Sequence, residues 1–402
     1  MKDKSTNSQE TRKWLNRNVA AMGFTSLFSD ASHEMTTAAL PSFLTELVGA
    51  ASAPQILGLI TGLSDASSSF VKMFSGWLSD KLRKRKPLVV LGYALTGLFV
   101  GIIGFARDWI ETFVYRVLAW MGRGTREPPR DALLADSVDK RFYGHAFGFH
   151  RAMDTVGAIT GPLLAFLLVS SLGLRNVFFL SMIPGFLAVL TIAIGVKETA
   201  RKQEERKGLF WHMKSLPKDF KVFLFIMFIF GIANFNRTLL LLRVQEVLTP
   251  LNGIIIAASI SMLLYTIRNI AQALADYGIG SISDRMGRKS LLALFGFFLF
   301  GITSIGFIYA ADIYFFTLLF ILSGISAATY TALEKAYAAD LLPSNIRGTG
   351  YGILQTIDGI GDFTSSFVVG TIWAMISPEL SFVYAALLSF AATLLLLGLM
   401  KR

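Results

Sequence analysis

The sequence predicts an all-α integral membrane protein with twelve transmembrane helices in two like halves. Of its 402 residues, 53% are hydrophobic and only 16% are charged, and the mean hydropathy is +0.55. A soluble domain carries about 25% charged residues, so this is the composition of a membrane protein. An internal repeat and a regular series of long apolar segments lead to the same fold class.

The internal repeat has an offset of 204 residues. The segment Gly280-Ser-Ile-Ser-Asp284-Arg285-Met-Gly287-Arg288-Lys289 has a near copy in Gly76-Trp-Leu-Ser-Asp80-Lys81-Leu-Arg83-Lys84-Arg85. The same offset places Asp154 over Asp358, and it serves most of the chain without gaps. We therefore predict two six-helix halves that run in parallel.

Twelve segments contain the roughly 20 mostly apolar residues that a membrane-crossing helix needs. They fall near 19–46, 54–79, 86–106, 110–133, 143–170 and 175–196, and then near 221–246, 252–278, 288–309, 313–340, 346–376 and 379–400. This pattern gives a tail at 1–18, bundles at 19–196 and 221–400, and a linker at 197–220. Aromatic and basic residues in the linker fit either a short helix in the membrane interface or a solvated tether.

Lysine and arginine in the loops predict the orientation, because short cytoplasmic loops are rich in both. One side of the predicted bundle has nineteen of these residues and the other only Arg107 and Arg175. We therefore expect both termini and the linker to be cytoplasmic, in a multi-pass protein of the cytoplasmic (inner) membrane.

Several other kinds of chemistry find no support. The chain has no cysteine, and its net charge of +11 comes from basic loops rather than from a nucleic-acid-binding face. His33-Glu34 begins a zinc-protease pattern, but residue 37 is threonine, so the second ligand is missing. We expect no metal, no cofactor, no nucleic acid and no enzymatic activity.

Two motifs carry a family resemblance. The pattern Gly-x-x-x-Asp-Arg-x-Gly-Arg-Lys is complete at 280–289, whereas the earlier copy has Arg83 where the second glycine is expected. Nearly the whole chain is similar to the major facilitator superfamily of secondary transporters. The resemblance implies two bundles around a central cavity and transport by alternating access.

The first motif implies a conformational gate. In the family, the equivalents of Asp80 and Asp284 latch the two halves by accepting hydrogen bonds at a helix start. The neighbouring basic residues would strengthen this latch or hold anionic lipid; they are Lys81, Arg85, Arg285 and Arg288. The alternative is that these basic residues only set the orientation.

The second motif is the spacing Gly148-x8-Gly157-x3-Gly161-Pro162, which resembles a motif of proton-linked exporters. The glycine pair that follows in that motif is here Ala165 and Phe166. Small residues along one face let a neighbouring helix approach closely. We expect these four residues to be structural.

Charged residues inside the predicted spans are costly, so each is a candidate functional residue. Asp30 and Glu34 share a helical face with His33 beside them, and we predict that these three residues and Asp154 carry protons. The candidates for substrate binding are Arg126, Arg130, Arg151, Asn234, Arg237, Arg268 and Glu334. The alternative for all of them is internal ion pairing.

The sequence thus predicts a monomeric, proton-coupled secondary transporter of a small polar solute, in contact with protons and membrane lipids. The excess of arginine favours an anionic solute that bears carboxylate or phosphate, such as a siderophore-like chelator. One alternative is a proton-linked exporter of lipophilic drugs. The other is a membrane receptor or lipid-handling protein that uses this fold without transport.

Overall fold

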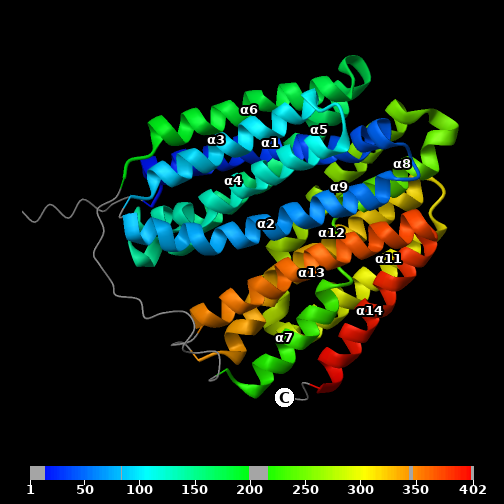
Figure 1. Ribbon diagram of the computed structural model, residues 1–402. Coiled ribbons are helices and arrows are strands. Elements are labelled where there is room, and N and C mark those ends of the chain that lie inside the picture. Colours follow the sequence, from blue (N-terminus) through cyan, green and yellow to red (C-terminus); the bar gives the residue numbers. More distant parts are fainter. Residues whose placement is uncertain (1–13, 83, 199–215, 344–346, 400–402) are drawn as a thin grey trace, which may run out of the picture.

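The computed structural model describes residues 14–82, 84–198, 216–343 and 347–399, and all regular elements in these ranges are helical (Figure 1). The first half contains α1 (Arg17–Val48), α2 (Ala53–Leu82), α3 (Lys86–Ile102), α4 (Trp109–Asp136), α5 (Tyr143–Leu172) and α6 (Leu174–Gly195). The second half contains α7 (Lys218–Gly231), α8 (Thr238–Asn252), α9 (Ile254–Met286), α10 (Arg288–Leu291), a π-helical stretch (Leu292–Phe298), α11 (Leu299–Tyr309), α12 (Ile313–Leu341), α13 (Arg347–Met375) and α14 (Pro378–Leu399). Most of the predicted tail and linker lies outside the described residues.

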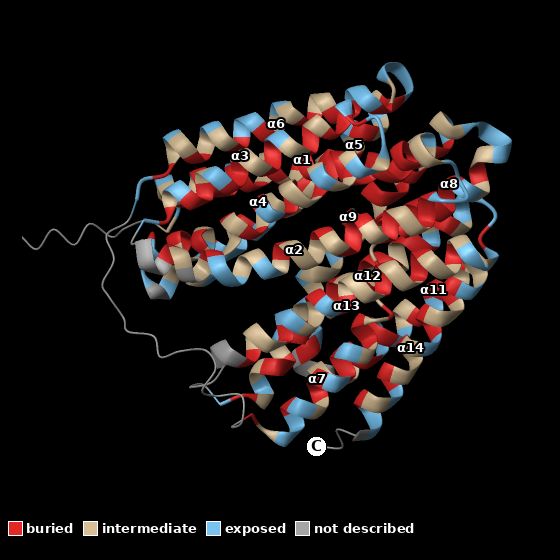
Figure 2. Cartoon of the chain, viewed as in Figure 1, coloured by how far each residue is buried: buried red, intermediate tan, exposed pale blue. Residues whose placement is uncertain are grey.

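The outer surface of the bundle is apolar, as contact with lipid requires. Phe186 and Ile194 on α6 and Leu387 and Leu394 on α14 are each more than 60% exposed, and both helices show exposed residues along their length (Figure 2). Within the described residues, seven helices are long and apolar enough to cross a membrane by themselves. Interior charged residues lie both on these helices, such as Arg268 on α9, and on the remaining ones, such as Glu34 on α1.

The sequence repeat is also a structural repeat. Asp108 caps the start of α4 and Asp312, 204 residues later, caps the start of α12, each by accepting backbone N–H hydrogen bonds. Gly49 and Gly253 both have φ of 77°, a left-handed conformation that glycine adopts without strain, and each ends a helix. The all-α, two-bundle fold predicted from the sequence is confirmed.

One predicted span is not a continuous helix. The segment expected at 221–246 is interrupted between α7 and α8, at residues 232–237. The freed backbone groups find partners in other helices: Ser365 donates its hydroxyl to the Asn234 carbonyl at 3.1 Å, and the Asn236 N–H donates to Ser366 Oγ at 3.1 Å. A broken helix is tolerated in a membrane where such groups are satisfied inside the protein.

The two halves are closed against each other at one end only. We call the end with Arg85, Lys86 and Arg141 the basic end, and the end with Gly49 and Gly253 the opposite end. Near the opposite end, α2 packs against α13 and α5 packs against α9. Figure 1 shows the helices of the two halves diverging toward the basic end.

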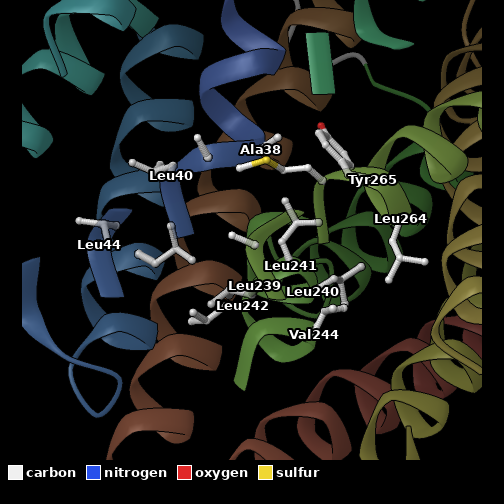
Figure 3. Close-up of a cluster of buried hydrophobic side chains, with 14 of the residues drawn as sticks. Ala38, Leu40, Leu44, Leu239, Leu240, Leu241, Leu242, Val244, Leu264 and Tyr265 are labelled. Atoms are coloured by element: carbon white, nitrogen blue, oxygen red, sulfur yellow. The ribbon is translucent and has the colours of Figure 1, made fainter. Parts of the chain in front are cut away.

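The buried apolar side chains follow the same division. A single cluster joins the halves near the opposite end, where Leu40 and Leu44 of α1 lie close to Leu239, Leu241 and Leu242 of α8 (Figure 3). Toward the basic end each half has a separate cluster instead, one around Tyr93 and one around Phe223. The structure is therefore closed at the opposite end by a shared apolar core.

Glycine contacts make this closure testable. A Cβ on Gly58 of α2 would lie 2.1 Å from the Ser366 carbonyl oxygen on α13. We expect Gly58→Leu to push α2 and α13 apart at the opposite end.

The separation can be measured with spin labels. Because the chain has no cysteine, labels at Ser52→Cys and Ser377→Cys report the distance between α2 and α13, which should increase by several ångströms. Gly398→Leu, at a glycine with no neighbour within 4 Å, is the control; an unchanged distance in Gly58→Leu would contradict this account of the closure.

Candidate functional site

A cavity of about 310 Å³ lies between the two halves, within the range of sites that hold small molecules. The first half contributes polar and aromatic side chains from α1, α2 and α4, namely Thr37, Asp65, Arg116, Trp120 and Arg123. The second half contributes the α7–α8 break, α9, α11, α12 and α13, including Asn234, Asn236, Arg237, Arg268, Gln272, Phe230, Phe300, Tyr330 and Asp362. The wall thus combines charged groups of both signs with aromatic rings.

The interrupted segment between α7 and α8 brings polar groups to the cavity. Asn236 donates its side-chain N–H to Asp65 Oδ2 across the two halves at 2.9 Å, and Trp120 donates to Asp65 Oδ1 at 2.7 Å. The sequence singled out Asn234, Asn236 and Arg237 in this segment and assigned Asn234 and Arg237 to substrate binding, but it missed Asp65. Two asparagines within three residues of an otherwise apolar span were the available signal for the break.

An ion pair next to the cavity joins the two halves. Glu34 on α1 accepts a hydrogen bond from Arg237 Nη2 at 2.7 Å and another from the Tyr265 hydroxyl on α9 at 2.6 Å. Glu34 and Tyr265 are buried, whereas the Arg237 side chain is about one-third exposed. The Glu34 carboxylate is therefore a link between α1 and the second half.

Of the other residues predicted to carry protons, His33 and Asp30 lie in a row next to Glu34, and Asp154 lies beside a more distant turn of α1. His33 Nε2 is 3.3 Å from Glu34 Oε1, and His33 Nδ1 is 3.4 Å from Asp30 Oδ1. Asp154 on α5 accepts a hydrogen bond from the Ser26 hydroxyl on α1. The structure thus brings Asp30, His33 and Glu34 together on α1 and places Asp154 on the helix that packs against it.

Arg123, another basic residue of the cavity wall, forms its ion pair inside its own half. Arg123 Nε donates to Glu127 Oε1 at 2.8 Å, and Lys72 Nζ lies 2.6 Å from Glu127 Oε2. The two cations therefore share the single charge of Glu127, and their side chains are each about one-third exposed. This is the internal ion pairing that the sequence left open as an alternative.

Arg116 and Arg268 have no such compensation. No carboxylate of the described residues lies within 4.0 Å of either guanidinium group, although both side chains are more than 90% buried. Arg116 stacks on the Trp120 ring at 3.5 Å and donates to Thr37 Oγ1, while its Nε and Nη1 have no partner. Arg268 donates to neutral oxygens of Ser323, Asn269 and Gln272. These two arginines can accept an oxyanion.

The remaining candidates for substrate binding do not line the cavity. Arg126 is buried beside the cavity-facing side of α4, over the Tyr93 ring at 4.1 Å, and donates to the Ser29 hydroxyl. Arg130 pairs with Asp131 at 2.8 Å. Arg151 is exposed and Glu334 is buried behind the wall, on α12. Arg116, by contrast, was not among the sequence candidates.

The gate candidates are described only in part. Arg85 pairs with Asp136 and Arg288 pairs with Asp340 at 2.6 Å, so each joins the start of a helix to the end of another helix in its own half. The side chains of Asp80, Lys81, Asp284 and Arg285 lie outside the described part of the chain. Their role as a latch stays a prediction.

The glycines of α5 differ from one another. A Cβ on Gly157 would lie 2.4 Å from the Leu27 carbonyl oxygen, and one on Gly161 would lie 2.6 Å from that of Ala31, so both allow α1 to approach. Pro162 is buried beside them. Gly148 has no neighbour within 4 Å, and the expected close approach does not occur there.

The fold and the cavity define a multi-pass membrane protein built from two helical bundles around a small-molecule site. The family model of the Major Facilitator Superfamily matches residues 22–248 and 223–402. The chain is 35% identical to an uncharacterized MFS-type transporter of Methanocaldococcus jannaschii over 97% of this chain and 96% of that protein. The chain belongs to the Major Facilitator Superfamily, a family of transporters of small molecules and not of enzymes.

More distant similarities span several kinds of solute. The multidrug resistance protein MdtG of Escherichia coli is 24% identical over 69% of this chain and 68% of its own. The crystal structure of the nucleoside transporter NupG superposes with a TM-score of 0.81 at 14% identity, over 96% of this chain and 100% of that one. The similarity to NupG, at 14% identity, concerns the fold alone.

The link between Glu34 and Arg237 leads to a prediction about stability. Glu34→Gln keeps an acceptor for Tyr265 but leaves Arg237 without a counter-charge, so we expect the free energy of unfolding to fall by about 1–3 kcal/mol. A double-mutant cycle with Arg237→Gln should show a coupling energy of at least about 0.5 kcal/mol. Asp131→Asn, which breaks a half-exposed pair, should change stability by less than about 1 kcal/mol. Strict additivity of the two substitutions would argue against the link.

Proposed function

We propose that this protein is a secondary active transporter of a small anionic solute, coupled to protons and working by alternating access. The observation that carries the proposal is the pair Arg116 and Arg268, buried at the cavity without a carboxylate partner. An unpaired buried charge is costly, and a carboxylate or phosphate of the solute would relieve this cost through charge-assisted hydrogen bonds. The siderophore-like chelators considered above belong to this chemical class.

Proton coupling would act through Glu34. While ionised, Glu34 holds Arg237 and accepts from Tyr265, so it links the two halves. A proton on Glu34 removes the ion pair, frees Arg237 for the solute and weakens the link. Proton and solute would then both change which closed state is favoured. His33, which lies between Asp30 and Glu34, would exchange protons with Glu34, and Asp30 and Asp154 would supply them from farther along α1 and α5.

The charge distribution supports an orientation. With the basic end in the cytoplasm, both termini are cytoplasmic and the structure represents a state that is closed toward the outside. The basic residues at that end would contact anionic lipid headgroups. We place this monomeric transporter in the cytoplasmic (inner) membrane.

A second candidate is a proton-linked exporter of lipophilic drugs. The similarity to MdtG and the glycine spacing of α5 favour it, as do the aromatic rings Phe230, Phe300 and Tyr330 in the cavity wall. Lipophilic cations would bind poorly beside Arg116 and Arg268. Ligand class therefore separates the two candidates.

The first test is a binding screen on the purified chain. Carboxylates and phosphates should raise its unfolding temperature, because a ligand that binds the native state stabilises it. Arg268→Gln should weaken anion binding about tenfold or more, the effect of losing charge-assisted hydrogen bonds. The exposed Arg151→Gln is the matched control and should bind as the unaltered chain does. Stabilisation by lipophilic cations, with no response to anions, would favour the drug exporter.

A flux assay tests proton coupling. Glu34→Gln cannot exchange a proton, so accumulation of a solute found in the screen, driven by a pH gradient in proteoliposomes, should be abolished. Exchange of solute down its own gradient should persist. Glu46→Gln, on α1 but away from the cavity, should retain pH-driven accumulation. Full proton coupling in Glu34→Gln would overturn the role of this residue, and an absence of flux in the unaltered chain would favour a receptor.

A further inference from the structure

Asp362 on α13 is a cavity carboxylate without a counter-charge of its own. No Lys, Arg or His of the described residues lies within 4.0 Å of it. The cations that act on it from farther away are Lys72 and Arg237. Both are already bound, Lys72 to Glu127 at 2.6 Å and Arg237 to Glu34 at 2.7 Å. Asp362 is therefore free to bind a cation from the cavity.

Aromatic rings lie on the same side of the cavity. Phe230 contacts Phe300 and Tyr330, with ring centroids 5.6 and 5.1 Å apart, and all three line the cavity. Tyr330 lies within electrostatic reach of Asp362. Faces of aromatic rings attract cations, and they do so more strongly where the cation is desolvated.

Two further carboxyl groups lie behind this wall. Tyr330 donates its hydroxyl to Asp358 Oδ1 at 3.3 Å, and the buried Glu334 beside them has an oxygen without a partner. Carboxyl oxygens beside an apolar surface are good partners for an ammonium group. This side of the cavity therefore favours a cationic group.

The internal repeat indicates that these charges are not required by the fold. At the offset of 204 residues, Asp362 corresponds to Ala158, Arg268 to Ser64 and Arg116 to Phe320. Each half therefore builds the same helix with an uncharged residue at the equivalent position. These three charges of the cavity wall are thus departures from the repeat, which a ligand would explain. Asp65, the other wall carboxylate with no described cation within 4.0 Å, accepts hydrogen bonds from Trp120 and Asn236 instead.

We propose that the transported solute is zwitterionic. Its carboxylate or phosphate binds Arg268 and Arg116, and its ammonium group binds Asp362 beside Phe230, Phe300 and Tyr330. This inference rests on the proposed function, because it identifies the substrate class of the same cavity. A solute with both charges provides a partner for the two arginines and another for Asp362, whereas a simple anion leaves Asp362 unpaired.

The test compares probes that carry one charge or both. Propionate, tetramethylammonium, glycine betaine, γ-aminobutyrate and phosphocholine are titrated against the purified full chain, with the unfolding temperature and calorimetry as readouts. At least one zwitterion should bind more than tenfold tighter than propionate and tetramethylammonium. Asp362→Asn should abolish this advantage while changing the affinity for propionate less than threefold, and Asp362→Glu should retain part of it.

Two further variants keep the test decisive if Asp362→Asn does not fold. Phe300→Leu keeps the charge but removes a ring, and it should weaken zwitterion binding severalfold without affecting propionate. Asp276→Asn, a carboxylate of α9 outside the cavity wall, should bind all probes as the unaltered chain does.

The outcomes separate the two proposals. If propionate binds as tightly as every zwitterion and responds to Arg268→Gln, the zwitterion inference is overturned and the anion transporter stands. If no anion or zwitterion responds to Arg268→Gln, the proposed function itself is overturned. Binding of tetramethylammonium alone, lost in Asp362→Asn, would overturn both.

Discussion

Compensation of buried charge is the constraint on which the rest of the structure depends. An apolar membrane solvates no ion, so each interior charge needs a partner in the protein or in a ligand. Glu127 forms ion pairs with Arg123 and Lys72, and Glu34 forms an ion pair with Arg237. The first partnership stabilises one half, whereas the second joins the halves. The charges that remain after this pairing are the ones we propose to bind the solute, whereas the paired Glu34 is the one we propose to couple protons.

The cavity forms because the two halves share a core at one end only. Apolar contacts between α1 and α8, together with the close packing of α2 against α13, hold the opposite end closed. The separate cores toward the basic end leave each half free to move as a unit. A few interactions near the cavity can therefore bias the whole assembly, because the bundles themselves need not deform.

The fold was predictable because hydrocarbon thickness sets the helix length and the repeat sets the helix number. The cavity was less predictable, since it depends on helix rotation and depth. Arg116, Trp120 and Arg123 share one face of α4 and reach the cavity. Arg126, three residues further, turns toward Tyr93 and Ser29 instead. The break between α7 and α8 was not predicted because the segments on both sides of Asn234, Asn236 and Arg237 are long and apolar, so the whole segment resembles one span.

Because residues 232–237 are not helical, α8 can move relative to α7, which one continuous helix would not allow. α8 is a rigid rod of 15 residues, about 22 Å long. Arg237 sits at its inner tip, and the leucines that seal the opposite end lie along its first turns. A ligand bound to Arg237 would therefore contact one end of the helix whose leucines close the opposite end. In the proposed transport cycle, solute binding at Arg237 and opening of the opposite end would both move this one helix.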